Sequence, residues 1–195
     1  MSNLNILFVC TGNICRSPMA EQIFNQLASK HQLPVTAHSA GLAAMTGEPM
    51  TAESQQAMAN LTYSTTAHRA KDLTAEMLAN SDLVLAMTLE HRSDIARMLP
   101  KASRYSFTLD EFARLVYFLT TNPEHSIEFT KRLEETREEF LRRAISEAIL
   151  LRGMVPTGDD PKDVTDPYGE GIEVYKEVAE NIDSMVKLIM EWMAG

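Results

Sequence analysis

The residues best suited to covalent chemistry lie near the start of the chain, in the segment Cys10-Thr11-Gly12-Asn13-Ile14-Cys15-Arg16-Ser17. A cysteine thiolate is a strong nucleophile, and five residues separate Cys10 from Arg16. The planar guanidinium group of an arginine can bind two oxygens of a phosphate group at once, a geometry that lysine does not match. The spacing therefore predicts a site at which Cys10 attacks a phosphorus atom while Arg16 holds the phosphate oxygens.

The elements expected on either side of this loop favour the same interpretation. Residues 5–9 form a short apolar run, which is typical of a buried parallel strand. Ser17 suits the N-cap of a helix and Pro18 suits its first position, so a helix is expected to begin there. The loop would then lie at the carboxyl edge of a sheet, where the helix N-terminus attracts an anion and stabilises a thiolate. Gly12 and Asn13 tolerate the left-handed backbone that such a tight loop can require.

Cys10 also has a purely structural interpretation. A cysteine at the end of a buried strand is more often a small core residue than a nucleophile, so its spacing from Arg16 does not decide its role. The strand before the loop and the helix after it strengthen the catalytic interpretation. The Ser17 hydroxyl could donate a hydrogen bond to a Cys10 thiolate.

Cleavage of a phosphate ester also needs a proton for the leaving oxygen, and Asp166 is the first candidate to donate it. It stands in the sequence VTDPYG, where Pro167 restricts it to an extended backbone and Tyr168 could line a pocket for a flat substrate. Asp166 could instead cap the last helix or close a turn. Three neighbouring acids stay open as alternatives on residue chemistry alone: Asp159, Asp160 and Asp163.

Short apolar runs alternate with helical patterns along most of the chain. This alternation predicts an α/β fold with three layers, in which a four-stranded, parallel, twisted sheet has helices on both faces. The expected strands are residues 5–9, 35–39, 83–87 and 104–109. The expected helices begin at about residue 17 and lie at 51–60, 73–80, 89–99 and 172–193. A chain of 195 residues is expected to form a single domain, residues 1–195.

Residues 111–154 have a different pattern, with apolar residues at helical spacing among many charges, and we interpret them as a helical insertion. One long amphipathic helix or two shorter ones fit this pattern, and the apolar stripe must be buried. The segment could cap the active site, mediate oligomer formation or pack as a passive pair of helices. We expect it to pack beside the mouth of the site and to influence the choice of protein substrate.

The composition restricts the partners and the compartment. A net charge of -9 argues against DNA or RNA as a partner, because a nucleic-acid backbone needs a basic face. The two cysteines, Cys10 and Cys15, are too few for a disulfide scaffold, which favours a reducing compartment. The N-terminus lacks a signal-peptide pattern, and no apolar run reaches the ~18 residues of a membrane span. A cytoplasmic protein without membrane insertion is expected.

The segment VCTGNICRSPMAE, residues 9–21, resembles the signature of the low-molecular-weight protein tyrosine phosphatases. Further likenesses are SAG at residues 39–41, DLVLAM at 82–87 and DPY at 166–168. Together they extend the resemblance over about residues 3–110 and 160–193.

The resemblance implies a catalytic role for three residues. Cys10 would be the nucleophile, Arg16 would bind phosphate, and Asp166 would act first as an acid and then as a base. The substrate would be a phosphorylated protein, and inorganic phosphate or other oxyanions would inhibit. Neither a metal nor a cofactor is implied.

The resemblance also assigns supporting roles around the nucleophile. The phosphate oxygens would be bound by the loop residues Thr11, Gly12, Asn13, Ile14, Cys15, Arg16 and Ser17. Polar side chains would hold the loop in shape, namely Asn13, Ser17 and Ser39. Cys15 would form a reversible disulfide with Cys10 and so protect it from over-oxidation, which thiol chemistry permits.

The substrate class is open between phosphotyrosine and phosphoarginine. Gly169 follows the DPY segment, as in bacterial members that include protein arginine phosphatases, whereas many tyrosine-specific members have a second aromatic residue there. Those arginine phosphatases typically have threonine at the position of Ile14. Isoleucine offers a phenyl ring a wider apolar contact beside Tyr168, although it could simply fill the core. We therefore favour phosphotyrosine.

The remaining candidate functions have less support. An arsenate reductase on the same fold would need further cysteines in the middle of the chain, and none follows Cys15. A phosphoprotein-binding module would have no need of the acid Asp166. The histidines are too scattered to indicate a site, so surface or capping roles are expected for His31, His38, His68, His91 and His125.

Overall fold

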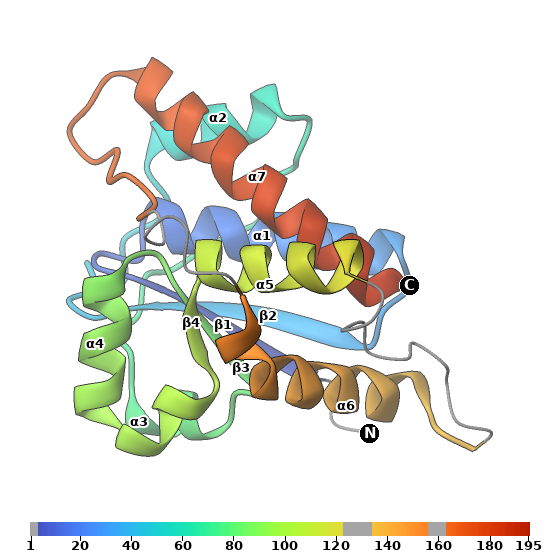
Figure 1. Ribbon diagram of the computed structural model, residues 1–195. Coiled ribbons are helices and arrows are strands. Elements are labelled where there is room, and N and C mark those ends of the chain that lie inside the picture. Colours follow the sequence, from blue (N-terminus) through green and yellow to red (C-terminus); the bar gives the residue numbers. More distant parts are fainter. Residues whose placement is uncertain (1–3, 123–133, 156–162) are drawn as a thin grey trace.

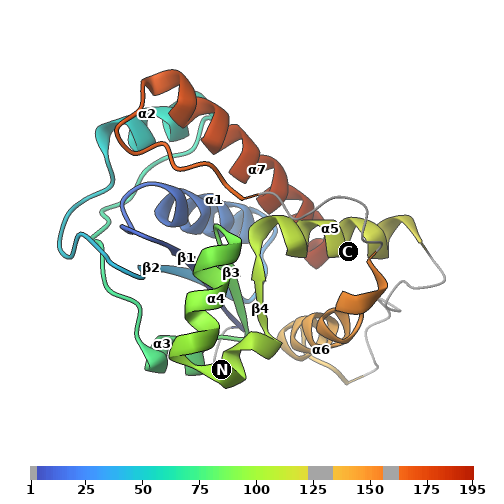
Figure 2. The same ribbon diagram turned by 60° about the vertical axis from the view of Figure 1, so that its left-hand side comes forward.

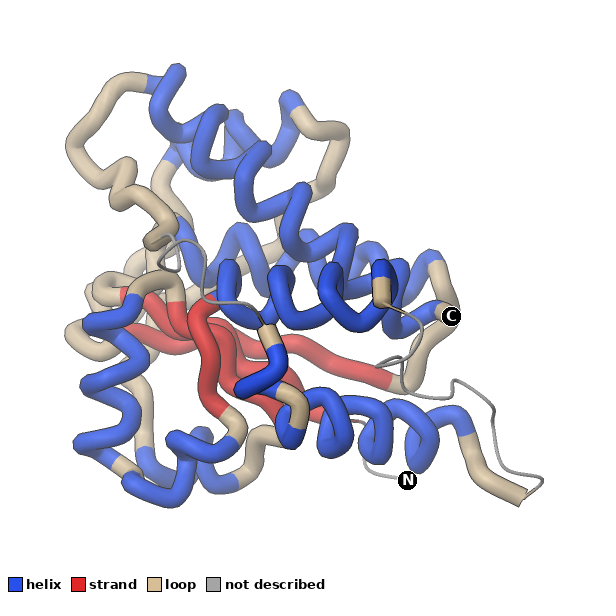
Figure 3. The backbone as a smooth tube through the Cα atoms, viewed as in Figure 1, coloured by secondary structure: helices blue, strands red, loops and turns tan. Residues whose placement is uncertain are grey.

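A parallel sheet forms the centre of the protein in the computed structural model, which describes residues 4–122, 134–155 and 163–195. Its four strands are arranged in the order β2-β1-β3-β4, and all neighbouring pairs are parallel (Figure 1). Their bounds are Leu4–Cys10 for β1, Val35–Gly41 for β2, Leu83–Ala86 for β3 and Ser106–Thr108 for β4. Figure 3 shows the strands as one layer with helices on both sides, so the predicted α/β fold is confirmed.

β1 lies between β2 and β3, which explains its almost uninterrupted apolar sequence. Both faces of a parallel sheet are covered by helices, so side chains pointing in both directions must be apolar. Val9 belongs to the apolar cluster on one face and Phe8 to the cluster on the other. The register places Cys10, the last residue of β1, beside Gly41 at the end of β2.

Helices cover both faces of the sheet. On the first face lie α1 (Arg16–Lys30), α5 (Leu109–Thr121) and α7 (Ile172–Ala194), with α2 (Ala52–Asn60) packed against α7. On the second face lie α3 (Ala75–Ala79), α4 (Leu89–Met98) and the 3₁₀ helix η1 (Pro100–Arg104), as Figure 2 shows from another side. Phe8 and Phe24 make an edge-to-face contact at 5.8 Å between ring centroids, which joins α1 to β1.

Threonines set the starting points of most of these helices. The side chains of Thr51, Thr74, Thr88 and Thr108 each accept a hydrogen bond from the backbone N–H three residues later. A cap of this kind stabilises a helix by about 1 kcal/mol. Capping by Thr74 also explains why α3 is shorter than the helix expected over residues 73–80.

β4 is shorter than the strand expected at residues 104–109. Residues 100–104 form η1, and the fixed φ angle of Pro100 suits the first position of such a helix. The strand therefore begins only at Ser106.

The charged segment after residue 110 forms helices in its described parts. α5 packs against α7, where the rings of Phe112 and Trp192 meet edge to face at 6.1 Å. α6 (Arg137–Leu150) follows and is continued by the short 3₁₀ helix η3 (Arg152–Met154). α6 buries its apolar side in the same core as α1 and α7, through Phe140, Leu141, Ala144, Ile145 and Ala148.

α6 lies far from the carboxyl edge of the sheet. Arg142 forms an ion pair with Asp82, which directly precedes β3, and Arg137 donates hydrogen bonds to the last carbonyl groups of α7. Figure 1 accordingly shows α6 at the opposite end of the sheet from the junction of β1 and α1. The expectation that this segment packs beside the mouth of the site is therefore wrong for α6. None of the described helices has the length and apolar character needed to cross a membrane.

Candidate active site

The loop that joins β1 to α1, residues 10–17, is called the phosphate loop below. α1 begins at Arg16, and its N-cap residue Cys15 makes no side-chain hydrogen bond to the first turn. The expectation that Ser17 caps this helix is wrong, because Ser17 is already inside it. A helix without a side-chain cap leaves its first N–H groups open to an anion, which is what phosphate binding requires.

The sulfur of Cys10 has two hydrogen-bond donors within the phosphate loop. Its Sγ atom lies 3.0 Å from Ser17 Oγ and 3.3 Å from the backbone nitrogen of Asn13. The Asn13 side chain donates to Ser17 Oγ at 2.9 Å, so the hydroxyl proton of Ser17 is directed toward the sulfur. Two donors on one sulfur stabilise the thiolate, which is the nucleophilic form.

Asn13 ties the phosphate loop to two other segments, β2 and the loop around Lys71. Its φ angle is 55°, a left-handed conformation that asparagine tolerates better than most residues. Its side-chain nitrogen donates to Ser39 Oγ at 2.8 Å, and its side-chain oxygen accepts from the backbone of Lys71 at 3.0 Å. Ser39 in turn donates to Glu21 at 2.5 Å. The side chains expected to support the loop therefore form one network, and Glu21 of α1 also belongs to it.

Arg16 and Asp166 meet in the folded chain although they are 150 residues apart. Arg16 is buried; its Nη2 atom donates to Asp166 at 2.5 Å, and its Nη1 atom donates to the carbonyl oxygen of Val164 at 3.2 Å. Its buried Nε atom has no hydrogen-bond partner among the described residues. A guanidinium group that reaches a carboxylate oxygen and still has an N–H to donate is suited to bind a phosphate group.

The structure places the alternative acids differently from Asp166. Asp166 lines the cavity next to Cys10, and about half of its side chain is exposed. Asp163 does not line this cavity, because its Oδ1 atom accepts a hydrogen bond from the backbone N–H of Leu89 at 2.8 Å. Asp159 and Asp160 lie outside the described residues.

A cavity of about 210 Å³ extends from Cys10 to the surface. Apart from the phosphate loop and Asp166, its walls are Ala43, Met45 and Tyr168, with Ile14 as the apolar member of the loop. Met45 is 43% exposed and Tyr168 is 59% exposed, which is consistent with a position at the opening of the cavity. Ile14 and Tyr168 were expected here from the sequence, whereas Ala43 and Met45 belong to no recognisable motif.

The loop that carries Ala43 and Met45 is attached directly to the phosphate loop. The backbone nitrogen of Ala43 donates to the carbonyl oxygen of Thr11 at 3.1 Å, and that of Met45 donates to Gly12 at 3.0 Å. Gly41 permits this close approach, since a Cβ atom there would lie 2.4 Å from the carbonyl oxygen of Thr11. The walls of the cavity are thus built on the loop that holds Cys10.

Two histidines contact the phosphate loop, so the expectation of surface or capping roles is wrong for them. His91 is 7% exposed, and its Nε2 atom lies 2.9 Å from Thr11 Oγ1. The Nε2 atom of His68 lies 2.7 Å from the carbonyl oxygen of Asn13. Burial, followed by the charge of Arg16, lowers the pKa of His91 to about 4, so it is neutral at pH 7. No motif in the sequence marks either histidine.

The second thiol of the phosphate loop lies against residues from other helices. Cys15 Sγ is 3.7 Å from Thr51 Oγ1 and 3.8 Å from the hydroxyl of Tyr175. Burial is the main cause that raises the pKa of the Cys15 thiol, so this residue is protonated at neutral pH. Cys10 and Cys15 are both free thiols that line the same cavity, and a reversible disulfide between them stays a prediction.

The groups that meet in the cavity are a thiol, a guanidinium group and a carboxyl group. Within the described ranges, no three histidine, cysteine, aspartate or glutamate side chains are grouped so that they could hold a metal ion. The three groups present can perform a nucleophilic displacement at phosphorus, with one to attack, one to bind the oxygens and one to transfer protons.

Comparison with known proteins also indicates a phosphatase. The family profile described as "Low molecular weight phosphotyrosine protein phosphatase" matches residues 5–120, which includes all but the last residue of α5 and ends before α6. The chain is 36% identical over 141 residues to the protein-arginine-phosphatase of Bacillus subtilis (strain 168), covering 72% of this chain and 93% of that protein. It is 39% identical over 105 residues to the low molecular weight protein-tyrosine-phosphatase Ptp of Acinetobacter johnsonii, covering 54% and 71%.

A solved structure supports this relationship. The low molecular weight protein tyrosine phosphatase from T. tengcongensis superposes with a TM-score of 0.70 at 31% identity, and the match covers 96% of this chain and 98% of that one. The resemblance seen in the signature around Cys10 is thereby confirmed, and the chain belongs to the low molecular weight phosphotyrosine protein phosphatase family.

Proposed function

We propose that the chain is a protein tyrosine phosphatase that hydrolyses phosphotyrosine through a cysteinyl-phosphate intermediate. The observation that carries this proposal is the cavity in which Cys10, Arg16 and Asp166 meet beside an apolar wall. Ile14 and Tyr168 are well suited to bind a flat aromatic ring, since apolar and aromatic side chains make favourable contacts with both its faces and its edges.

In the first step the Cys10 thiolate attacks the phosphorus atom, and the S–P bond forms as the bond from phosphorus to the phenolic oxygen breaks. Arg16 and the backbone N–H groups of the phosphate loop stabilise the charge on the three other oxygens. A phosphate group that takes the Nη2 hydrogen bond of Arg16 frees Asp166 to carry a proton. Asp166 gives this proton to the leaving oxygen, so tyrosine departs as a neutral phenol.

In the second step a water molecule attacks the phosphorus atom of the cysteinyl phosphate. Asp166, now ionised, takes a proton from this water, the P–S bond breaks, and Cys10 leaves as a thiolate. The Ser17 hydroxyl and the Asn13 N–H stabilise that thiolate as they did before the attack. Inorganic phosphate is the product and is held by the same groups as the substrate, so phosphate and similar oxyanions should inhibit.

Protein arginine phosphatase is the second candidate, since the relative from Bacillus subtilis has that name. The guanidinium group of phosphoarginine would be stabilised by acidic or polar groups beside the phosphate. Among the described residues that line the cavity, Asp166 is the only carboxylate, and Ile14 presents an apolar surface. These walls suit a phenyl ring better than a charged guanidinium group.

Substitution of Ile14 tests this assignment with a matched control. Valine and threonine have nearly the same shape, so Ile14→Val and Ile14→Thr differ mainly by one hydroxyl group. Phosphate release would be measured from phosphotyrosine and phosphoarginine peptides of otherwise identical sequence, with Cys10→Ser as the inactive control. We expect the wild type and Ile14→Val to prefer phosphotyrosine, and Ile14→Thr to lose about tenfold in kcat/KM on that substrate.

The other outcomes identify the alternatives. Preference of the wild type for phosphoarginine would keep the mechanism and overturn the substrate. Turnover of neither peptide, with tight binding of one, would favour a phosphoprotein-binding module. Reduction of arsenate with an added thiol, without phosphatase activity, would favour an arsenate reductase.

A further inference from the structure

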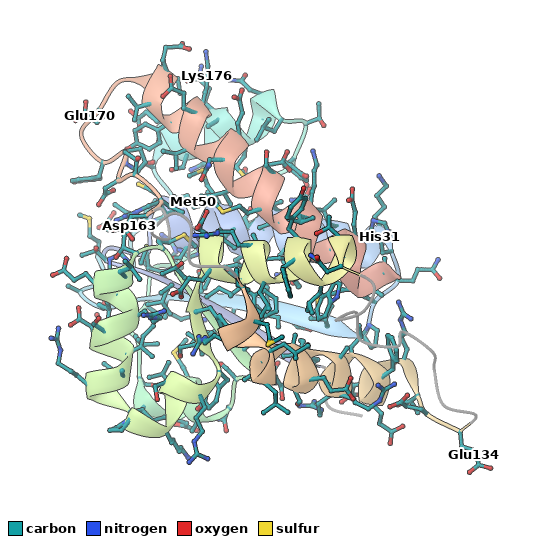
Figure 4. The ribbon with its side chains drawn as sticks, in the orientation of Figure 1. His31, Met50, Glu134, Asp163, Glu170 and Lys176 are labelled. Atoms are coloured by element: carbon teal, nitrogen blue, oxygen red, sulfur yellow. The ribbon has the colours of Figure 1, made fainter. Side chains whose placement is uncertain are left out.

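Asp163 makes a contact that the mechanism above does not use. Its Oδ1 atom accepts a hydrogen bond at 2.8 Å from the backbone N–H of Leu89, the first residue of α4. α4 already has a cap, because Thr88 accepts from the N–H of His91, so Asp163 satisfies a different N–H group of the same turn. The partial positive charge of a helix N-terminus also favours a carboxylate there. Figure 4 shows Asp163 over the start of α4.

The residue after Asp163 is held to the same junction. The backbone nitrogen of Val164 donates to Met87 at 2.9 Å, and its carbonyl oxygen accepts from Arg16 at 3.2 Å. The Val164 side chain is buried. Only one residue separates this anchored pair from Asp166, so the place of the acid depends on where residues 163 and 164 are attached.

The junction of β3 and α4 also holds the phosphate loop. The Met87 backbone nitrogen donates to the carbonyl oxygen of Val9 at 2.9 Å, and His91 contacts Thr11 at 2.9 Å. Residues 87–91 therefore support the segment that carries the nucleophile and the segment that carries the acid. A shared support keeps the two catalytic groups at a constant separation.

We infer that Asp163 is a positioning residue for the general acid. Its carboxylate fixes the acid loop, residues 163–168, to the first turn of α4 and so holds Asp166 beside Arg16 and the leaving oxygen. Asp163 does not line the cavity, so it acts through Asp166 and not on the substrate. The inference rests on the proposed function, in which Asp166 gives a proton to the leaving group.

The dependence of kcat/KM on the leaving group tests this inference, because kcat/KM reports the steps up to the departure of the phenol. A dinitrophenyl ester hardly needs a proton, whereas a phenyl ester does. We expect Asp163→Ala to lose about tenfold in kcat/KM on phenyl phosphate and less than about twofold on dinitrophenyl phosphate. Asp163→Asn keeps an oxygen that can accept from Leu89, so it should stay within about threefold of the wild type on both esters.

Two further variants separate the possible causes. Asp166→Asn should show the same selective loss on phenyl phosphate, only larger. Thr74→Ala removes the cap of α3, away from the cavity, and should leave the ratio of the two esters unchanged.

If Asp166→Asn loses activity selectively on phenyl phosphate but Asp163→Ala behaves as the wild type, Asp163 does not position the acid, and the assignment of Asp166 as the acid stands. Equal losses on both esters for Asp166→Asn would instead overturn the proposed role of Asp166. Selective loss in Asp163→Asn as large as in Asp163→Ala would also overturn the anchoring role, because the amide can still accept from Leu89.

Discussion

The proposed reactivity of Cys10 depends on single hydrogen bonds from Asn13 and Ser17. Both are fully buried, so each polar atom must find a partner within the protein. The Asn13 amide orients the Ser17 hydroxyl, and the hydroxyl then donates to the sulfur. Loss of a partner that leaves a buried polar group unsatisfied costs about 1–3 kcal/mol. The same bonds therefore stabilise the loop and hold the Cys10 sulfur in place for the proposed attack.

His91 should make the protein less stable in mild acid. Its pKa falls from an ordinary value of 6.5 to about 4 in the folded protein, chiefly through burial. Between these two values the unfolded chain takes up a proton that the folded protein does not, so the stability declines as the pH falls. Asparagine cannot titrate, so the free energy of unfolding of His91→Asn should fall by about 2 kcal/mol less than that of the wild type between pH 7 and pH 5.

Urea unfolding at a series of pH values measures this difference. His38 is exposed, so His38→Asn is a suitable control and should follow the wild type. Parallel stability curves for His91→Asn and the wild type would show that His91 is not kept neutral by folding.

α1 and α4 bring the reactive groups together from opposite faces of the sheet. α1 begins within the phosphate loop and supplies Arg16, while the first turn of α4 holds Thr11 through His91. Both helices follow strands that are neighbours, β1 and β3, so their starting points lie at the same edge. This is the edge at which open α/β sheets bind ligands.

The packing of α6 predicts that it contributes to stability rather than to catalysis. Phe140 is buried, and the guanidinium groups of Arg137 and Arg143 lie 5.0 and 5.4 Å from its ring centroid. Phe140→Ala should reduce the free energy of unfolding by about 3–5 kcal/mol, because it leaves a cavity in the core. The value of kcat/KM should stay within about twofold of the wild type, since α6 lies at the opposite end of the sheet from the junction of β1 and α1 and a lost core contact acts only locally.

Urea unfolding and turnover of an aryl phosphate under native conditions check this prediction. Leu150→Ala is a matched control on the same helix, because Leu150 is 83% exposed and should change neither quantity. A stable Phe140→Ala protein with a large loss of kcat/KM would show that α6 is coupled to the cavity after all.

The whole molecule has a net charge of -9, which affects the approach of a peptide substrate. A negative field attracts basic peptides and repels acidic ones before the phosphate reaches Arg16. At low salt we expect phosphotyrosine peptides flanked by lysines to have kcat/KM about fivefold higher than peptides flanked by glutamates. At 0.5 M salt screening should reduce this ratio to less than about twofold.

Initial rates at two salt concentrations give both ratios. A charge-free peptide serves as the control and should respond least to salt. A preference for acidic flanks, or a ratio that salt does not change, would mean that local contacts and not the overall field select the peptide.

Much of the fold could be predicted because local sequence patterns indicate its strands and helices. Short apolar runs in the chain indicate the four strands, and alternation with helices indicates a parallel sheet. The misplaced boundaries have local causes. η1 includes Arg104, the first residue of the expected fourth strand. α1 begins at Arg16, directly after the tight turn of the phosphate loop and without a side-chain cap.

The sequence alone indicated the class of chemistry, because Cys10 and Arg16 lie in one loop between an expected strand and an expected helix, within a segment that resembles a phosphatase signature. Only the tertiary structure decided which groups complete the site. The side chains that complete the site come from two helices and two loops, namely His91, Glu21, His68 and Met45, and their contacts exist only when the sheet is assembled. It also decided that α6 lies away from the cavity. An amphipathic pattern indicates that one face of a helix is buried, but it does not indicate which part of the protein covers that face.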